Sequence, residues 1–389
     1  MARLGDIATV ITKGTTPTTL GFSFQDKGIN FVKIESVSEN GTFISDKFDH
    51  ISEECHDKLK RSQLQNNDIL FSIAGAIGRT AIVTEDVLPA NTNQALAIIR
   101  VPQGVINYSF LLYVLQSSVI SEQAEKKKQG VAQLNLSLKD ISEFNIPDIP
   151  LVQQQLIVES LDEVSNLISL RKQQLAKLDE LVKSRFVELF GDPIDNPKAF
   201  PIRKLKTLSR KISDGVHAKP QYTETGRPFL SVVNINKGVI NFDGCKFVSE
   251  DAYQKMIKST HPERGDVLYT KVGATYGIPA YVDTDTEFCL YVSVCLIKPL
   301  HEEINSRFLS LSMGMPYVKR QADSRIKGIG VPDLHLNQIS EFDILCPPRD
   351  LQEQFIAFVE QTDKSKFEIQ QSLEKLETLK KALMQKYFG

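Results

Sequence analysis

A single internal repeat constrains what this chain can fold into more than any other feature of its sequence. The segment Ile141-Ser142-Glu143-Phe144 recurs letter for letter as Ile339-Ser340-Glu341-Phe342, 198 residues later (339 minus 141). The same offset relates further landmarks: Asp68-Ile69-Leu70 and Asp266-Val267-Leu268, Gly75 and Gly273, Gly130 and Gly328, and Leu189-Phe190-Gly191 and Tyr387-Phe388-Gly389. Because a period of half the chain implies one structural unit used twice, we expect two similar halves.

Each half has the same internal order of a globular stretch, a proline pair and a long helical stretch. Residues 1–150 alternate short apolar runs with Gly, Asn and Pro turns, which is typical of an α+β domain. From 152 to 190 no Pro or Gly occurs, and apolar residues follow coiled-coil spacing. After Pro347 and Pro348, the segment 351–388 repeats this spacing. The polar exceptions on the two stripes are Arg171, Arg185, Thr362, Lys366 and Lys380.

Neither helix can bury its apolar stripe alone. At a rise of ~1.5 Å per residue, each helix of roughly 38 residues would reach ~57 Å. We expect the two helices to pack antiparallel, with the globular domains at opposite ends and related by an approximate two-fold axis. The alternative is an ordinary core stripe of one compact domain. The charged exceptions mark either solvated edges or sites where partner helices dock.

The predicted fold class is therefore α+β, with two similar α/β domains separated by two long antiparallel coiled-coil spacer helices. The expected order along the chain is a first domain at 1–150, a central helix at 151–191, a second domain at 192–348 and a C-terminal helix at 349–389.

Composition narrows the class of protein. No apolar run approaches the ~18 residues that cross a membrane, and the first residues lack a secretory signal, so we expect a cytoplasmic protein. The five cysteines form no C-x-x-C pair, and we expect Cys289 and Cys295 to lie in the core, where they could share one face of a strand. With 46 basic and 48 acidic residues, the net charge of −2 argues against a free-standing, charge-driven DNA binder.

One family pattern stands out in the second half. The run Asp214-Gly215-Val216-His217-Ala218-Lys219-Pro220-Gln221-Tyr222, followed by Pro228-Phe229-Leu230 and Gly265-Asp266-Val267-Leu268, resembles the target-recognition domain of type I restriction-modification specificity subunits. The first half has a weaker version, Thr12-Lys13-Gly14-Thr15-Thr16-Pro17, which lacks the His and the Tyr. Leu134-Asn135-Leu136 and the helix starts Gln155-Leu156-Ile157 and Gln354-Phe355-Ile356 agree with the same family, so the resemblance covers the whole chain.

The resemblance implies a noncatalytic subunit that binds double-stranded DNA, two modification (methyltransferase) subunits and, in the full enzyme, two restriction subunits. Each domain would read one half of a bipartite, asymmetric target, and the helices would set the unread gap. The modification subunits would methylate an adenine in each half with S-adenosylmethionine, and restriction subunits would use ATP and Mg. No cofactor is expected on this chain.

Candidate DNA-binding residues are those with directed hydrogen-bonding groups or positive charge near predicted turns. The basic clusters precede equivalent glycines of the two halves, although each could be a solvated charge run. Side chains beside the Gly75 and Gly273 turns could reach DNA, although plain turns would have the same sequence, and His217 could instead satisfy the turn around Asp214. The full set is Lys13, Thr15, Thr16, Arg79, Asn91, Asn93, Gln94, Lys126, Lys127, Lys128, His217, Lys219, Tyr222, Lys271, Tyr276, Arg320, Arg325 and Lys327.

Catalytic motifs are missing from the sequence. Cys346-Pro347-Pro348-Arg349 lacks the amide and the aromatic group with which an adenine methyltransferase grips a flipped base. No Walker-type phosphate loop occurs, and Gly328-Ile329-Gly330 fails the dinucleotide pattern. We therefore expect no catalysis by the isolated chain and no bound metal. Two other functions stay open, a specificity adaptor of another phage-defence methylase and a protein-interaction scaffold that does not bind DNA. An undetected enzyme is the weakest of the alternatives.

Overall fold

The computed structural model describes residues 1–127, 135–235, 238–326 and 330–389. The chain forms two compact units, and each takes part of both long helices. Unit 1 comprises residues 1–172 and 370–389, and unit 2 comprises residues 173–369. The linear order of two domains and two helices expected from the sequence therefore corresponds to two units that each close with helical segments from distant parts of the chain.

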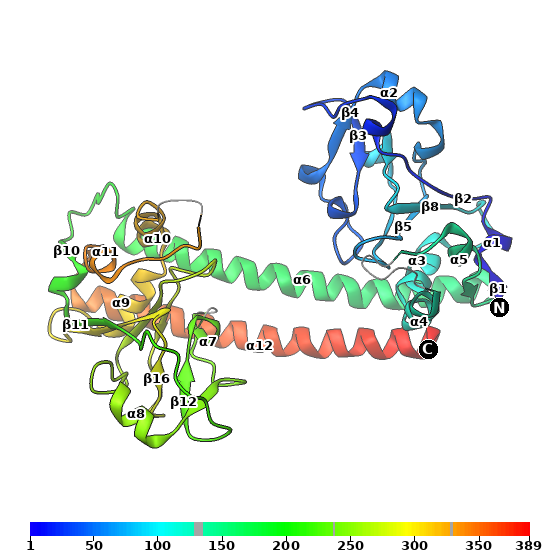
Figure 1. Ribbon diagram of the computed structural model, residues 1–389. Helices are drawn as coiled ribbons and strands as arrows, with labels where there is room; N and C mark the ends of the chain where they lie inside the picture. Colours follow the sequence, from blue (N-terminus) through cyan, green and yellow to red (C-terminus); the bar gives the residue numbers. More distant parts are fainter. Residues whose placement is uncertain (128–134, 236–237, 327–329) are drawn as a thin grey trace. The chain divides into compact units, whose positions relative to one another are not determined.

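Unit 1 contains three small sheets and short helices (Figure 1). Its strands are β1 (Ala2–Arg3), β2 (Val10–Lys13), β3 (Ile29–Val32), β4 (Asp49–Ile51), β5 (Ile69–Ser72), β6 (Thr80–Ile82), β7 (Ala90–Thr92), β8 (Leu96–Arg100) and β9 (Asn145–Ile146). Its short α-helices are α1 (Leu4–Ile7), α2 (Glu53–Lys58), α3 (Tyr108–Gln116), α4 (Ser118–Lys127) and α5 (Leu138–Ser142). The sheets have the strand orders β2-β8-β5-β6, β4-β3-β7 and β1-β9.

Unit 2 repeats this topology strand for strand. Its strands are β10 (Ile202–Lys204), β11 (Ser209–Asp214), β12 (Arg227–Leu230), β13 (Lys246–Val248), β14 (Val267–Thr270), β15 (Pro279–Tyr281), β16 (Cys289–Leu290), β17 (Val294–Pro299) and β18 (Asp343–Leu345). Its short α-helices are α7 (Val232–Ile235), α8 (Glu250–Met256), α9 (Ser306–Met313), α10 (Pro316–Asp323) and α11 (Leu336–Ser340). Corresponding sheets have the orders β11-β17-β14-β15, β13-β12-β16 and β10-β18. The expectation of two similar domains from one repeat is confirmed.

The four-stranded sheet of each unit is buried on both faces because its side chains alternate between two cores. In unit 1, Ile69 and Phe71 face the cluster that includes the helices. Leu70, one residue along the same strand, faces the cluster shared with the second sheet. A strand covered on both sides needs apolar side chains in both directions, which explains the consecutive apolar residues Ile69, Leu70 and Phe71.

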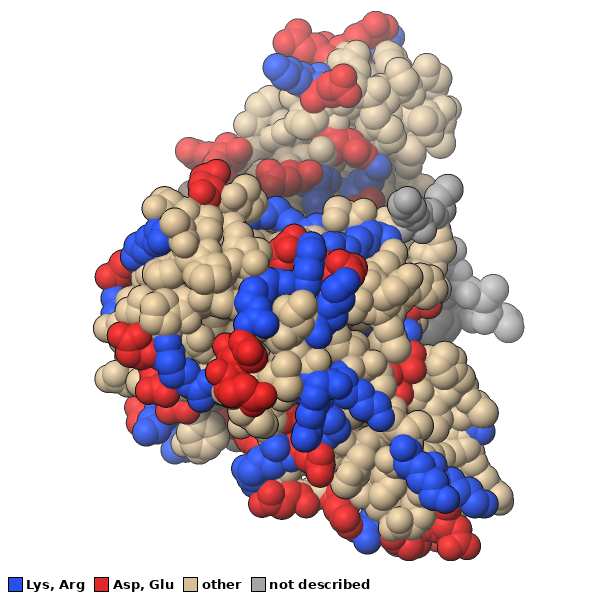
Figure 2. All heavy atoms as spheres, turned by 90° about the vertical axis from the view of Figure 1, so that its left-hand side faces the viewer, with Lys and Arg blue, Asp and Glu red and all other residues tan. Residues whose placement is uncertain are grey.

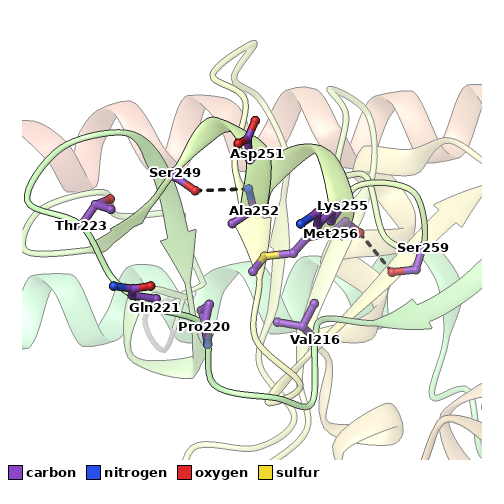
Figure 3. A pocket seen from close by; sticks show the side chains of 10 residues that line it. All are labelled: Val216, Pro220, Gln221, Thr223, Ser249, Asp251, Ala252, Lys255, Met256 and Ser259. Carbon is purple, nitrogen blue, oxygen red and sulfur yellow. Dashed lines mark hydrogen bonds between the residues drawn. The ribbon is translucent and has the colours of Figure 1, made fainter.

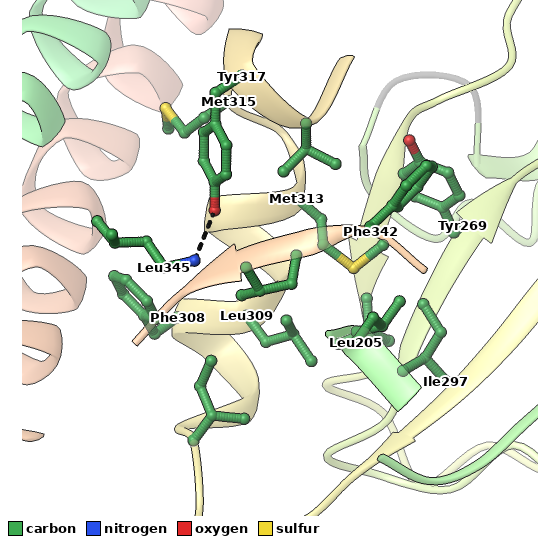
Figure 4. Close-up of a cluster of buried hydrophobic side chains, with 14 of the residues drawn as sticks. Leu205, Tyr269, Ile297, Phe308, Leu309, Met313, Met315, Tyr317, Phe342 and Leu345 are labelled. Carbon is green, nitrogen blue, oxygen red and sulfur yellow. Dashed lines mark hydrogen bonds between the residues drawn. The ribbon is translucent and has the colours of Figure 1, made fainter. Parts of the chain in front are cut away.

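Side chains alternate in the same way in unit 2. Tyr269 belongs to the cluster that includes the helices, here called the helical core, and Leu268 belongs to the cluster shared with the three-stranded sheet. Figure 4 shows part of the helical core, in which Phe308, Tyr317, Phe342 and Leu345 converge from different elements. Cys289 and Cys295 are both buried, as predicted. They do not share a face, because Cys289 lies in β16 and Cys295 in β17, and they belong to separate clusters. Desolvation raises the pKa of the Cys289 thiol to about 12.

The long helices are α6 (Leu151–Phe190) and α12 (Arg349–Phe388), each of 40 residues. In unit 1, Lys172 of α6 pairs with Glu377 of α12 at 3.2 Å, while Leu161 shares a core with Phe388. The higher-numbered end of α12 thus lies beside the lower-numbered end of α6, so the helices run antiparallel there.

Unit 2 shows the same direction, with Lys366 pairing with Asp179 at 2.6 Å and Phe355 packing on Phe186. All positions predicted for the two stripes are buried or half-buried, namely 161, 164, 168, 171, 175, 178, 182, 185 and 189 on α6, and 355, 359, 362, 366, 369, 373, 376, 380, 383 and 387 on α12. Two of the charged exceptions on α12 have partners on other elements: Lys366 is paired with Asp179 of α6, and Lys380 lies over the Tyr113 ring of α3 at 5.8 Å. They are therefore held by groups of their own unit.

A glutamine near the start of each long helix fixes that helix to its domain. The Gln154 side chain accepts a hydrogen bond from the Asn107 N–H at 2.8 Å and donates one to the Ile149 carbonyl at 2.7 Å. In unit 2, Gln352 accepts from the Asn305 N–H at 2.9 Å and donates to the Pro347 carbonyl at 2.8 Å. Both side chains are buried, and in each the amide oxygen accepts one of these hydrogen bonds and the amide nitrogen donates the other. The junction between domain and helix is therefore repeated along with the fold.

Candidate nucleic-acid interface

Part of the predicted DNA-binding set meets at one edge of unit 1, where β2 ends beside the turn between β7 and β8. The residues brought together are Lys13, Thr15, Thr16, Asn93 and Gln94. The Thr16 hydroxyl donates to the Gln94 side-chain oxygen, and the Asn93 side chain accepts from the Ala95 N–H at 3.1 Å. Lys13 and Gln94 are exposed. This edge therefore offers a cation and a side-chain amide to a ligand, groups suited to phosphate and base contacts.

A glycine makes the turn at this edge possible. A Cβ atom on Gly14 would lie 1.8 Å from the Thr92 carbonyl oxygen, and one on Gly215 would lie 2.0 Å from the Leu290 carbonyl oxygen. No side chain fits at such distances, so only glycine lets the chain leave the sheet here. The two glycines occupy corresponding places in the two units, directly after β2 and β11.

The loop that follows Gly215 carries three candidates of unit 2. His217 is 77% exposed, and its Nε2 lies 3.4 Å from Asp214 Oδ1. Lys219 is exposed, whereas Tyr222 packs edge-on against Phe229 with 5.8 Å between ring centroids. His217 and Lys219 are thus exposed to a ligand, whereas Tyr222 packs against the domain.

Asn91 does not face solvent. It is fully buried in β7, and its Nδ2 donates to the Leu59 carbonyl at 3.2 Å and to the Ser62 hydroxyl at 3.0 Å. Its Oδ1 lies 2.5 Å from His56 Nδ1. The amide that we expected to read adenine instead holds the turn η4 (Lys60–Ser62) against the sheet, so Asn91 is removed from the candidate set.

Two candidate arginines also have structural partners. Arg79 Nη1 donates to the carbonyls of Ile34 at 3.2 Å and Val37 at 3.0 Å. Arg325 donates to the carbonyls of Gln321 at 2.7 Å and Glu341 at 3.2 Å. Each guanidinium therefore ties its own domain together, and its charge is oriented toward protein carbonyls.

Lys271 and Tyr276 also have partners within the protein. The Lys271 side chain is 6% exposed, and its ammonium lies 3.6 Å from Asp214 and 3.5 Å from Asp333. The Tyr276 hydroxyl donates to Asp323 at 2.5 Å. The prediction that these two side chains reach DNA directly does not fit their surroundings, because one is buried between carboxylates and the other is bound to α10.

The basic clusters are only partly described. Lys126 is exposed at the end of α4, while Lys127 pairs with Glu143 and, through that hydrogen bond, lowers the pKa of the Glu143 carboxyl. In unit 2, Arg320 is 55% exposed, with its guanidinium 3.9 Å from Asp192. Lys128 and Lys327 lie outside the described residues. Figure 2 shows lysine and arginine side chains gathered near the centre of the displayed face, with acidic side chains between them.

Within the described residues, no group of three or more His, Cys, Asp or Glu side chains is arranged to hold a metal ion. In the same part of the chain, no helix is long and apolar enough to cross a membrane.

Comparison with known proteins identifies the family. A family model described as the type I restriction modification DNA specificity domain matches residues 1–180 and 203–381. The chain belongs to this family. The two matched segments correspond to the two copies of the repeat, so the resemblance inferred from the sequence is confirmed.

Curated relatives of this chain are specificity subunits of type I restriction enzymes. The EcoBI specificity subunit of Escherichia coli is 31% identical over 169 residues, which are 42% of this chain and 35% of that protein. The MjaIX specificity subunit of Methanocaldococcus jannaschii is 22% identical over 336 residues, 82% of this chain and 76% of that protein. The alignment with EcoBI thus spans about a third of that relative's length.

Solved structures of the specificity family show the same fold. The S subunit of a type I restriction-modification system from M. genitalium aligns over 100% of this chain and 95% of its own, with a TM-score of 0.55 and 14% identity. A structure described for complex assembly and conformational transition of the type I R-M system aligns over 100% and 96%, with a TM-score of 0.61 and 18% identity.

No sequence motif marks the surface beside α8. Gln221 lies in the family run, but nothing in the residue order indicates that it faces Lys255 and Met256 across a cleft. The length difference between the loops after Gly14 and Gly215 is the sequence signal that indicates this surface.

Proposed function

We propose that this chain is the DNA sequence-recognition subunit of a type I restriction-modification enzyme and reads a bipartite, asymmetric target. The observation that supports this most directly is one fold used twice with different side chains at the corresponding edge. Unit 1 offers Lys13 and Gln94 there, and unit 2 offers His217 and Lys219. Because base-edge readout depends on the donors and acceptors presented, two such edges would read different half-sites.

The long helices would set the unread gap between the half-sites. At ~1.5 Å per residue, a helix of this length measures roughly 60 Å. Half-sites read from one face of B-DNA recur about every ~34 Å, one helical turn. In this proposal α6 and α12 act together as a ruler, and their pairing in each unit keeps it stiff.

Two adenine-N6 methyltransferase subunits, joined by restriction subunits in the full enzyme, would dock on this chain. Exposed apolar side chains on α6 support a protein partner there, since Val152 is 77% exposed, Leu156 59% and Leu170 54%. In this assignment S-adenosylmethionine belongs to the modification subunits, ATP and Mg belong to the restriction subunits, and this chain binds no cofactor.

Domain exchange tests the proposal. Residues 1–150 are replaced by the corresponding part of another specificity subunit, and methylated adenines are mapped in the genome of a host that carries the modification subunits. We expect one half-site to change and the other to remain. A change in both half-sites, or in neither, would contradict the division of reading between the units.

A protein-interaction scaffold that does not bind DNA is the second candidate, and the net charge of −2 favours it. A specificity adaptor for another phage-defence methylase would share the DNA-reading role and differ in its partners. Electrophoretic binding to random duplex at low salt, with and without a modification subunit, separates the scaffold from the DNA reader.

A further inference from the structure

A cleft in unit 2 opens between the loop after β11 and helix α8, with a volume of about 560 Å³. Its apolar floor is formed by Val216 and Pro220 on the loop and Met256 on α8, and Figure 3 shows Met256 extending toward the loop. Gln221 and Lys255 lie at the polar rim. A ligand held here would meet apolar surface and a positive charge together.

Both walls of the cleft are anchored. At the loop start the Val216 N–H donates to the Leu290 carbonyl at 2.9 Å, and at its end the Thr223 N–H donates to the Phe247 carbonyl at 3.0 Å. On the other side, Ser249 caps α8 by accepting from the Ala252 N–H at 3.3 Å. The cleft is therefore a preformed feature of the fold, which reduces the entropy cost of binding.

Unit 1 fills the corresponding place with its own chain. Cys55 and Leu59 in unit 1 follow the N-cap Ser52 at the same spacing at which Ala252 and Met256 follow Ser249. In unit 1 the connection is three residues longer, 15–24 against 216–222. Its extra length includes the turn η1 (Pro17–Leu20), after which the aromatic pair Phe22 and Phe24 packs on the cluster that contains Cys55 and Leu59.

The difference in loop length changes how much of the helix is exposed, α2 in unit 1 and α8 in unit 2. Cys55 is 0% exposed and Leu59 4%, whereas Ala252 and Met256 are both partly exposed and line the cleft. The shorter loop of unit 2 therefore leaves apolar side chains uncovered at a place where the sister unit covers them.

Lysine side chains lie in the cleft lining and on the elements next to it. Lys255 lines it, Lys219 lies on the loop, and Lys246 lies over the Tyr222 ring at 4.3 Å. Asp251 is the acidic member of the lining. An apolar surface beside the Lys255 ammonium complements a sugar–phosphate segment, whose deoxyribose is largely apolar and whose phosphodiester is anionic.

We propose that the α8 cleft of unit 2 holds a sugar–phosphate segment of one DNA strand, with Lys255 contacting the phosphate and Met256, Val216 and Pro220 contacting the sugar. The proposal rests on the proposed function, because it names the surface through which unit 2 meets its half-site. It also predicts an asymmetry, since unit 1 has no counterpart contact where Phe22 and Phe24 pack. Backbone contacts of this kind fix the register of a protein on DNA without specifying bases.

The test uses the full chain in complex with its modification subunits and a duplex that contains the mapped target. Lys255→Gln is compared with Lys258→Gln, which removes an exposed lysine three residues further on that does not line the cleft. We expect Lys255→Gln to lower the slope of log binding constant against log salt by about one, more than the control does. Equal slopes for the two variants would overturn the proposal.

Single neutral methylphosphonate linkages along the duplex locate the contact. At one position within the half-site of unit 2, the wild-type complex should lose affinity and the Lys255→Gln complex should show no further loss. Ala252→Leu, which narrows the cleft without changing charge, should abolish the same positional effect. If no position depends on residue 255, the cleft does not hold the backbone. If the wild-type complex fails to bind the duplex at all, the proposed function itself fails, which is a distinguishable result.

Discussion

The ammonium of Lys298 lies 2.6 Å from a carboxylate oxygen of Asp266 inside unit 2, where the two side chains are only 9% and 4% exposed. The corresponding pair in unit 1 is Arg100 and Asp68, whose guanidinium and carboxylate form two hydrogen bonds of 2.7 Å. In both units the aspartate also accepts a backbone N–H, from Gln65 at 2.7 Å and from Glu263 at 2.8 Å. The cation changes type between the repeats while the buried carboxylate is retained.

Removal of this cation should strongly destabilise unit 2. Lys298→Met leaves Asp266 buried without its cation, and the free energy of unfolding should fall by about 3–5 kcal/mol. Urea denaturation followed by circular dichroism measures this, with Lys258→Met as an exposed control. Replacing both partners, Lys298→Met with Asp266→Leu, should cost less than the single change. A single variant as stable as the control would show that the pair does not stabilise the fold.

The loss in Lys298→Met should also depend on pH. Desolvation already raises the pKa of Asp266, and loss of Lys298 should raise it further. A carboxyl whose pKa is higher in the folded state binds its proton more tightly there, so the penalty is largest above that pKa. It should shrink as the pH falls through the raised value toward the unfolded-chain value near ~3.9. Denaturation midpoints measured from pH 7 to pH 4 should therefore converge on those of the wild type.

Phe186 should be the most sensitive position of the helical core in unit 2. Its ring contacts Phe190, Phe308 and Phe355 with centroids 4.9, 6.4 and 5.5 Å away, so it joins both long helices to α9. Phe186→Ala should lower the free energy of unfolding by about 3–5 kcal/mol. The neighbouring Val187 is 51% exposed, and Val187→Ala is the matched control with little expected effect. Similar denaturation midpoints for the two variants would contradict this packing.

The ion pair between Lys366 and Asp179 should contribute modestly to helix pairing. Asp179 is 63% exposed, so solvent screens the attraction, and exposed pairs contribute about 0.2–1 kcal/mol. Lys366→Glu should destabilise unit 2 by an amount in this range, and adding Asp179→Lys should restore stability. The double-mutant cycle in low salt measures the coupling, and a coupling of zero would show that the contact has no net effect.

The contact between the β14–β15 hairpin and α10 should weaken in acid. Hydrogen bonds from Lys319 and Tyr276 lower the pKa of the Asp323 carboxyl. A depressed carboxyl pKa means that the contact is fully present above the unfolded-chain value near ~3.9 and is lost as the pH falls through the lower folded value. Nuclear magnetic resonance of the Tyr276 ring should follow this titration. Asp323→Asn should remove it, and a titration that survives in that variant would assign it to another group.

Lys126 should contribute more to DNA binding than Lys127. Lys126 is exposed, whereas Lys127 is already paired with Glu143. Lys126→Gln should therefore lower the salt slope of DNA binding by about one, and Lys127→Gln by less. Lys139, an exposed lysine on α5, provides the control. The cluster does not meet DNA if all three variants keep the wild-type slope.

The sequence predicted the fold because the relevant signals are periodic. The repeat of Ile141-Ser142-Glu143-Phe144 predicts two copies of one unit. The positions of 161–189 that follow coiled-coil spacing are buried or half-buried in the structure. The candidate site was harder to predict, because residue type does not indicate which way a side chain points. Asn91 and Lys271 have the chemistry of DNA contacts, yet both are buried among protein partners. The three-residue difference between the loops after Gly14 and Gly215 acquires meaning only when the opposing helix is known.

The buried glutamines near the starts of α6 and α12 restrict which parts of each domain must stay constant when its sequence changes. Gln154 and Gln352 bind main-chain N–H and carbonyl groups. Every residue supplies a main-chain carbonyl, and every residue except proline supplies an N–H. Substitutions can therefore accumulate over the rest of a domain while the hydrogen bonds between the domain and its long helix stay the same. Recombination near these junctions can therefore exchange one whole domain while the hydrogen bonds that attach it to its helix are preserved.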